Sequence, residues 1–334
     1  MFSRLIFSAF IVLAALHCKA QFQRFNFSQS KMGSPFIITF YDDDSLHAAV
    51  TAQQCFALVD EYVLVYSDYI DSSELNLLCA KSGTGIPFQV SAALMDIIQQ
   101  SKTAFEKSNG SFDITLGPLS RLWRKARKEK IFPDEEMVKE KLALTGFNKI
   151  IIDTVLQTVL LTQKGMQLDL GGIAQGYIAQ KVINFLKEKG INNALVNVSG
   201  DIAAIGTPPN MQPWTIGINL PQSNKELLNQ KLQITNKAVT TSGDVYQYME
   251  HNGKRYSHII DIKTGYGITS GRNVTVIAND ATTADWFTKA CSLLPVNKAK
   301  KLAQQLQAEF LITEIRKGKL VFYATNGIDK YWKK

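Results

Sequence analysis

Apolar residues recur along the chain with two spacings, and each spacing predicts one kind of element. An apolar residue at every third or fourth position predicts helices at 46–65, 90–105, 173–188, 282–294 and 298–306. Short β-branched and aromatic runs predict strands at 35–41, 150–152, 155–161, 194–198, 214–220, 233–234, 274–277, 310–315 and 320–324. Strands and helices are interspersed without a regular strand-helix-strand alternation, which predicts an α+β fold with mixed or antiparallel sheets flanked by helices.

The first twenty residues differ from the rest of the chain. Arg4 precedes an apolar run that ends at Leu16, and the small residues Cys18 and Ala20 suit signal-peptidase cleavage after Ala20. We therefore expect a signal peptide at 1–20, one intertwined unit at 21–334 and export to the periplasm. A lipid anchor on Cys18 is a second interpretation, which the bulky His17 before it disfavours.

Composition excludes several classes of protein. The 334 residues are 46% hydrophobic, which is enough for a large core, and neither repeats nor low-complexity tracts occur. Cys55, Cys79 and Cys291 are too few for a disulfide framework and have no metal-ligand spacing, so we expect buried thiols. The formal net charge is +8, with a basic run at 121–130. This run is more typical of a solvated helix or loop, so we expect no nucleic-acid partner.

Carboxylates next to glycine or at the edges of apolar segments are the candidates for chemistry. Asp169 precedes Gly171 and Gly172 and then a predicted helix, where bare backbone groups could meet a phosphate or a metal. Four more aspartates are placed similarly in the second half of the chain: Asp201, Asp244, Asp261 and Asp285. Each one alone is more simply interpreted as a helix cap or a turn former, but five together favour a site.

Asp285 and His258 are the strongest single candidates. Asp285 lies near the start of an otherwise apolar helix, and a hard cation such as Mg²⁺ takes carboxylate, carbonyl and phosphate oxygens. His258 lies in Ser-His-Ile-Ile-Asp, where an imidazole could relay a proton at a phosphorus centre, although a lone histidine is more often structural. The remaining histidines lack zinc spacing, and serine-hydrolase and P-loop motifs do not occur in the sequence.

Taken together, the motifs resemble those of the FAD:protein FMN transferases, the ApbE flavin-transferase family. Any one of them is weak, whereas their shared order over most of the mature chain is specific. They are, in chain order, Met32-Gly-Ser34, Ser111-Phe-Asp113-Ile-Thr115 with Gly117-Pro-Leu119 and Trp123, Asp169 to Tyr177, Ala194 to Asp201, Thr240-Thr-Ser242-Gly-Asp244, Ser257 to Gly265, Val274-Thr-Val276, and Ala284-Asp285.

The resemblance implies an exported, magnesium-dependent enzyme that cleaves FAD and moves FMN onto a threonine or serine of a client flavoprotein, releasing AMP. The client would lie outside the cytoplasm, and the enzyme could associate with a membrane through it. The implied FAD-binding residues are Met32, Phe112, Asp113, Asp169, Gln175 and His258. The implied metal ligands are the Gly172 carbonyl and the Asp285 carboxylate, with His258 and Asp285 as the implied catalytic residues.

Two positions depart from the family pattern. The family usually has lysine where Gln175 stands, and it usually has a metal-binding threonine where this chain has Lys289. A protonated lysine cannot bind Mg²⁺, so Lys289 either supplies charge to the pyrophosphate or weakens metal binding. Thr288 could replace the threonine only in a shifted helix, because one residue turns a helix by about 100°. Two alternatives therefore stay open: an FAD pyrophosphatase that yields FMN and AMP, and a catalytically silent flavin-binding protein.

Overall fold

The computed structural model describes residues 22–209, 212–219, 228–243, 247–316 and 319–333. The predicted signal peptide, with Cys18, lies outside these residues, as does Asp244. The helices are α1 (Ser45–Tyr66), α2 (Glu74–Ala80), α3 (Ala92–Lys107), α4 (Gly117–Glu129), α5 (Glu135–Ala143), α6 (Ala174–Glu188), α7 (Ala281–Leu293) and α8 (Val296–Leu306). Short 3₁₀ turns are η1 (Ile114–Leu116), η2 (Phe147–Lys149) and η3 (Ile328–Tyr331).

The strands of the described residues form one large sheet and three small ones. The large sheet has eight strands in the order β1-β2-β6-β7-β10-β13-β14-β15. The strand bounds are β1 (Gln23–Lys31), β2 (Ser34–Asp42), β3 (Phe88–Gln89), β4 (Ile150–Asp153), β5 (Thr158–Leu161), β6 (Ala194–Val198), β7 (Asp201–Ile205), β8 (Trp214–Ile216), β9 (Leu232–Ile234), β10 (Ala238–Ser242), β11 (Tyr248–His251), β12 (Lys254–Ser257), β13 (Asn273–Ala278), β14 (Glu309–Arg316) and β15 (Lys319–Ala324).

Every paired strand in these sheets runs antiparallel to its neighbour. The α+β prediction is confirmed, and of the two sheet types that it allowed, the antiparallel one forms. The predicted hairpin between 148 and 161 is the β4 and β5 pair. Within the described residues, no helix is both long and apolar enough to serve as a membrane span.

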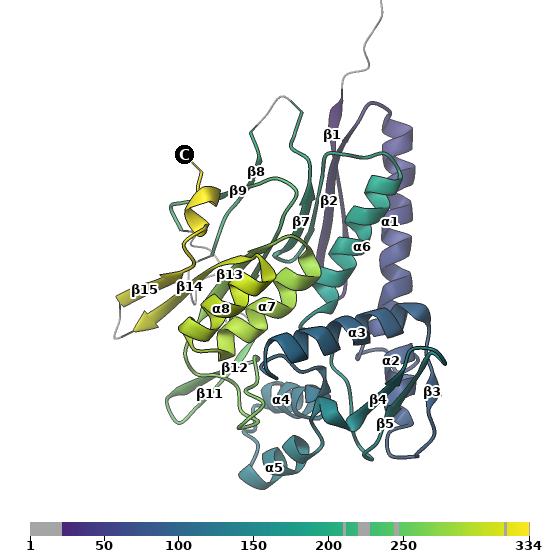
Figure 1. Cartoon of the computed structure of the whole chain (residues 1–334), viewed down its shortest axis with the longest axis vertical. Helices are drawn as coiled ribbons and strands as arrows, with labels where there is room; N and C mark the ends of the chain where they lie inside the picture. The colour runs from purple at the N-terminus through teal and green to yellow at the C-terminus, as the bar shows by residue number, and fades with distance from the viewer. Residues whose placement is uncertain (1–21, 210–211, 220–227, 244–246, 317–318, 334) are drawn as a thin grey trace, which may run out of the picture.

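Both faces of the large sheet are buried, because side chains alternate between two cores. On β2, Phe36, Ile38 and Phe40 pack in the main core with residues of α1, α6, α7 and α8. The next residue, Tyr41, points to the opposite core, which the β8 and β9 hairpin and η3 cover. Figure 1 shows α6, α7 and α8 lying across one face of the sheet, while α2 to α5 gather at one end of the molecule. The helices thus form a layer from which α7 can present side chains to the sheet.

The segment from 128 to 140, which the sequence predicts to be the least organised, is more regular than expected. Helix α4 continues to Glu129, and α5 begins at Glu135. Asp134 caps α5 by accepting a hydrogen bond from the Met137 amide at 2.8 Å. The polar composition misled the prediction because α4 and α5 bury a narrow apolar stripe, including Trp123 and Val138, in a small core of their own.

Candidate functional site

Helix α7 carries the most buried charged pair of the predicted site. Asp285 and Lys289 lie one turn apart on the same side of the helix, with Lys289 Nζ 2.5 Å from Asp285 Oδ1. The Asp285 side chain is 1% exposed and that of Lys289 is 20% exposed. The second carboxylate oxygen of Asp285 accepts the backbone N–H of Gly176, at the start of α6, at 2.9 Å. Both oxygens of this carboxylate are therefore occupied by donors from the chain.

A second carboxylate, that of Asp201, faces this pair from the sheet. Ala203 and Ile205 of β7 point into the main core, so the alternation along the strand turns Asp201 to the same side, beneath α7. Burial and the negative charge of Asp285 raise the pKa of Asp201 to about 7, against the opposing effect of Lys289. Burial lowers the pKa of Lys289, but the two carboxylates outweigh it and the net shift is upward. The lysine is thus an ammonium ion held between two acids.

The glycine turn before α6 lies against this cluster. A Cβ added to Gly172 would be 3.2 Å from the ring of Phe112, a tight contact, and 3.4 Å from Lys289 Cγ, an ordinary van der Waals contact. Phe112 in turn packs on Trp286 of α7, with ring centroids 6.1 Å apart. The turn therefore packs closely on α7, and the predicted residues Phe112, Gly172 and Asp285 are brought together around Lys289.

Asp169 and Asp113 flank the turn on the other side. The Asp169 amide donates to the Ile114 carbonyl at 2.7 Å, which joins the glycine turn to the segment around Asp113. The Asp169 carboxylate accepts the Gly171 amide at 2.8 Å. Asp113 is buried and accepts both the amide and the hydroxyl of Thr115, at 2.8 and 2.7 Å. Burial raises the pKa of Asp113, which these bonds only partly offset. Asp169 thus holds the glycine turn, and Asp113 caps η1.

His258 lies where the positive charge of Lys289 reaches it. Burial, and then the charge of Lys289, lower the pKa of His258 to about 4, so the imidazole is neutral at neutral pH. Its Nδ1 is 3.2 Å from the Gln247 carbonyl oxygen. Because a carbonyl can only accept, Nδ1 carries the proton and Nε2 keeps a free electron pair. His258 is arranged as a proton acceptor.

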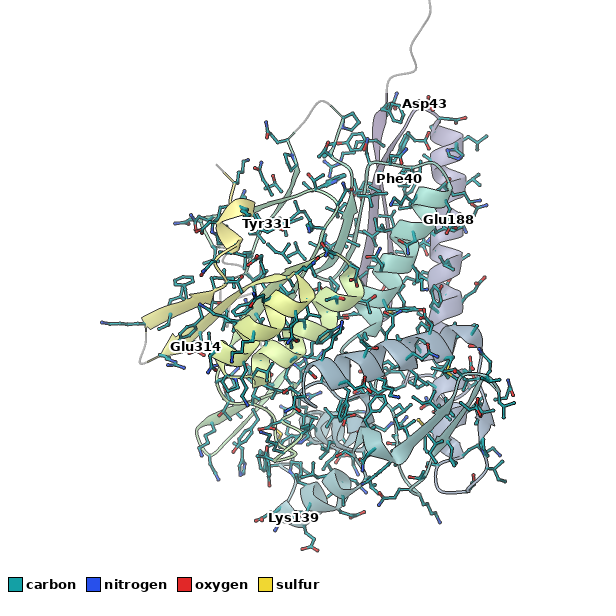
Figure 2. The ribbon with its side chains drawn as sticks, viewed as in Figure 1. Phe40, Asp43, Lys139, Glu188, Glu314 and Tyr331 are labelled. Carbon is teal, nitrogen blue, oxygen red and sulfur yellow. The ribbon has the colours of Figure 1, made fainter. Side chains whose placement is uncertain are left out.

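The other predicted residues lie further from this cluster or serve the backbone. Met32 and Gly33, both at positive φ, form the tight turn between β1 and β2, and Met32 packs on the main core. Figure 2 labels Asp43 at the far end of this strand pair, so the turn lies at the end nearer α3. Gln175 is half-buried on the first turn of α6. Asp261 is a turn former, whose carboxylate accepts the Lys263 amide at 2.9 Å.

Comparison with known proteins identifies the family of this chain. The family model described as the ApbE family matches residues 32–312. The chain belongs to the ApbE family. A relative from Klebsiella pneumoniae (strain 342), named FAD:protein FMN transferase, is 32% identical over 276 residues, which are 82% of this chain and 84% of the relative. A relative of the same name from Treponema pallidum (strain Nichols) is 31% identical over 274 residues, covering 78% of this chain and 75% of the relative.

Solved ApbE structures share the fold. The flavin transferase ApbE from Vibrio cholerae superimposes with a TM-score of 0.82 at 25% identity, covering 93% of this chain and 100% of that one. The flavinyl transferase ApbE from Pseudomonas stutzeri, in its apo form, gives a TM-score of 0.81 at 26% identity, covering 93% and 97%. The predicted family resemblance and fold are therefore confirmed.

The donors of this ApbE chain do not fit the magnesium ion that the resemblance implies. Lys289 has no electron pair to give while protonated, and its ammonium lies against the Asp285 oxygen that would bind the metal. The Thr288 hydroxyl donates to the Asp285 carbonyl at 2.7 Å and cannot take the place of the missing threonine. Across the described ranges, no group of three or more His, Cys, Asp or Glu side chains could hold a metal.

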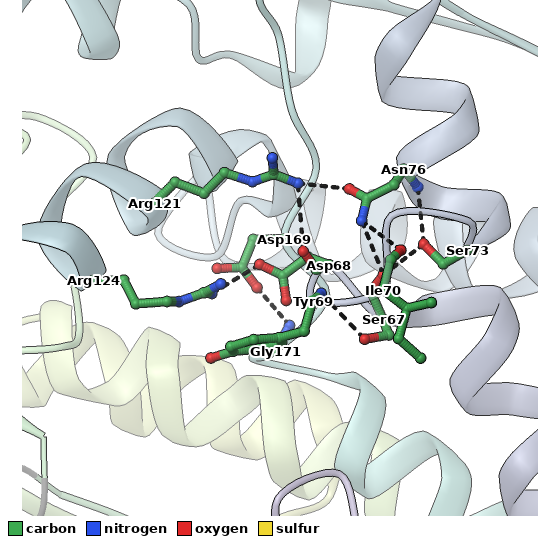
Figure 3. Close-up of polar contacts among 10 residues, drawn as sticks. All are labelled: Ser67, Asp68, Tyr69, Ile70, Ser73, Asn76, Arg121, Arg124, Asp169 and Gly171. Atoms are coloured by element: carbon green, nitrogen blue, oxygen red, sulfur yellow. Dashed lines mark hydrogen bonds and ion pairs between the residues drawn. The ribbon is translucent and has the colours of Figure 1, made fainter. Parts of the chain in front are cut away.

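Sequence reasoning missed a polar cluster beside Asp169, which Figure 3 shows. Arg124 donates to Asp68 at 2.8 Å and stacks over the Tyr69 ring at 4.0 Å, while Arg121 donates to Asn76 at 2.6 Å. Burial and the negative charge of Asp169 raise the pKa of Asp68, although Arg124 opposes them. The run at 121–130 was expected to be solvated, yet Arg121 and Arg124 bind partly buried partners. An Arg at every third position of a helix was the available signal.

Proposed function

We propose that this chain transfers FMN from FAD to a threonine or serine hydroxyl of a client flavoprotein and releases AMP. The observation that carries the proposal is the meeting of the family motifs at one place. The glycine turn at Asp169 to Gly172 packs against Lys289 of α7, and the charges of Lys289 and Asp169 both act on His258, although these residues come from three separate segments of the chain. The relatives named FAD:protein FMN transferase support the same activity.

The reaction needs a base, and His258 supplies it. The acceptor hydroxyl oxygen forms a bond to the phosphorus of the FMN half, and the bond from this phosphorus to the bridging oxygen breaks. The electron pair of the broken bond stays on that oxygen, which leaves as part of AMP. The hydroxyl proton passes to His258 Nε2, which is unprotonated because burial and Lys289 lower the pKa of the ring.

The turn before α6 orients the flavin nucleotide in this proposal. Phe112, packed at Gly172, provides an apolar contact beside the N-terminus of α6, and this combination suits an aromatic group joined to phosphate. Met32, Asp113, Asp169 and Gln175 complete the proposed FAD-binding residues. Because the donors present do not fit magnesium, no step of the reaction is assigned to a metal ion.

We also propose that the chain is exported and acts outside the cytoplasm. The apolar leader with its cleavage pattern at Cys18 to Ala20 supports this, and a flavoprotein client in the membrane would bring the enzyme to the membrane surface.

The activity is tested by incubating residues 21–334 with FAD and a peptide that carries one acceptor threonine. Mass spectrometry should find the peptide heavier by FMN, with AMP formed in equal amount. His258→Ala should lower the rate at least about a hundredfold, since general-base catalysis contributes at least that much. His47→Ala is the matched control, because this histidine of α1 pairs with Asp42 at the end of β2. Free FMN and AMP without labelled peptide would indicate a pyrophosphatase, and unreacted bound FAD a silent flavin-binding protein. Either result would refute the transfer.

A further inference from the structure

The position of Lys289 is unusual for a lysine. Its Nζ contacts the 1% exposed Asp285 and faces Asp201, while its aliphatic stem packs on the glycine turn at Gly172. A surface lysine gains little from one ion pair, but here two acids surround one ammonium in a site from which most water is excluded. Two carboxylates around one positive charge are also the arrangement of a site that binds a metal cation. Here the positive charge is the ammonium of Lys289, which is part of the chain itself.

Two contacts fix the ammonium there. Helix α7 places Lys289 one turn after Asp285, and the Gly176 amide holds the other oxygen of the same carboxylate. The Lys289 stem lies beside the glycine turn, where a Cβ added to Gly172 would be 3.4 Å from Lys289 Cγ. The charge is therefore held at the junction of the glycine turn, α7 and His258.

We propose that the Lys289 ammonium takes the place of a divalent metal ion in this chain. It provides the positive charge for the FAD pyrophosphate and for the AMP oxygen that leaves. This inference rests on the proposed function, because it names the cation of that same site. Lys289 acts by hydrogen bonding and charge and exchanges no proton, so the bond changes and the transfer of the hydroxyl proton to His258 stay as described above.

The consequence is an enzyme that works without a divalent cation. One ammonium carries half the charge of Mg²⁺ and cannot bridge two phosphates as a ligand, so turnover should be slower but insensitive to chelation. Lys289→Thr removes the ammonium and places a hydroxyl one turn after Asp285. This substitution should open a metal site at Asp285 and make turnover depend on Mg²⁺.

The first experiment measures metal binding without requiring turnover. Mn²⁺ is titrated into the mature protein with AMP present and is followed by the electron paramagnetic resonance signal of free Mn²⁺. The wild type should leave the signal unchanged, and Lys289→Thr should remove about one Mn²⁺ per chain. Lys300→Thr, on the exposed side of α8, is the control and should behave as wild type. One Mn²⁺ bound per wild-type chain would overturn the proposal.

The second experiment measures FAD affinity and turnover in EDTA. Wild-type turnover should change less than twofold when EDTA is added, whereas Lys289→Thr should lose at least about tenfold and recover with Mg²⁺. Lys289→Met should bind FAD roughly tenfold more weakly in EDTA, as expected for loss of one charge-assisted hydrogen bond. Lys289→Arg keeps the charge and should stay insensitive to EDTA. Complete loss of wild-type turnover in EDTA would refute the inference.

The two proposals can fail separately. If no product forms under any condition, the proposed function is wrong, and the Mn²⁺ and FAD titrations still decide the role of Lys289. Equal FAD affinity of wild type and Lys289→Met in EDTA would then overturn the inference. If Lys289→Thr does not fold, as judged by circular dichroism, the wild-type measurements with and without EDTA give the decision alone.

Discussion

At the scale of single residues, the site depends on charges that balance one another. Lys289 and Asp285 are i,i+4 partners, yet their burial makes them differ from a surface pair, which contributes at most about 1 kcal/mol. Taking one partner away leaves the other charged in a place that water scarcely reaches. Removing one partner should therefore lower the stability of the protein more than replacing both partners by uncharged residues.

Asp285→Asn tests this expectation for stability. The change keeps the shape of the side chain but leaves Lys289 without its nearest counter-charge, so the free energy of unfolding should fall by about 3 kcal/mol. The double variant Asp285→Asn with Lys289→Met should recover more than half of the loss, since no charge is left unpaired. Urea denaturation of both variants measures these differences. A single variant as stable as the wild type would show that water reaches Lys289.

At the scale of elements, the crossing of α6 and α7 sets the position of the carboxylate. A Cβ on Gly176 would lie 2.2 Å from the Ala281 carbonyl oxygen and 2.6 Å from Asp285 Cβ, so the two helices approach through the missing side chain. The same approach lets the Gly176 amide reach Asp285 at 2.9 Å. One glycine thus determines both helix packing and the orientation of the buried acid.

Gly176→Ala separates packing from helix propensity. In an open helix this change would stabilise the chain by about 1 kcal/mol. At this crossing it should instead destabilise it by about 1–3 kcal/mol, because the helices must move apart. Asn184→Ala, on the exposed side of α6, is the control and should be neutral or slightly stabilising. Thermal and urea unfolding give the sign. A stabilised Gly176→Ala variant would contradict the close crossing.

At the scale of the whole molecule, the large sheet brings together acids from opposite ends of the second half of the chain. Asp201 begins β7, and Asp285 lies on a helix that packs across β7, β10 and β13. The pKa of Asp201 rises to about 7 from burial and the nearby Asp285. In the unfolded chain this carboxyl titrates at its ordinary, lower pKa, so the native state binds more protons than the unfolded state in the window between the two values.

Stability should therefore fall as pH rises from about 4 to about 7, as far as Asp201 contributes. Asp201→Asn cannot ionise and should lose this part of the pH dependence. The test compares melting temperatures of wild type and variant at pH 5 and pH 8. The melting temperature of the wild type should fall more between pH 5 and pH 8 than that of the variant. His258 contributes in the opposite direction between about 4 and 6.5, and it does so equally in both proteins. Equal losses would show that Asp201 is ionised throughout this range.

Several elements with strong periodicity were predictable, although the alternating strand β1 and the buried strand β7 were not predicted. Helix α1 ends within one residue of its predicted bounds on each side, and strand β6 matches its predicted bounds. In both elements the buried residues repeat with the period of the helix or the strand. Strands β10 to β12 and helix α2 were not predicted. They are short, and the hairpin of β11 and β12 is polar on much of its length, so neighbouring strands rather than local pattern hold them.

The sequence by itself determined the family, the α+β class with mixed or antiparallel sheets, and most of the residues near the site. It also showed the i,i+4 spacing of Asp285 and Lys289, which indicated that a lysine ammonium stands where the family has a metal ligand. Such features are local, because capping, periodicity and helical spacing depend on residues a few positions apart.

Only the tertiary structure decided which of these residues meet. It joined Asp169 to Ile114, set Asp201 beneath α7 and placed the Lys289 ammonium on the carboxylate that a metal would need. The physical reason is that alternation tells which face of a strand is buried but not which helix covers it. That choice depends on the order of strands in the sheet and on how closely α6 and α7 can cross at Gly176.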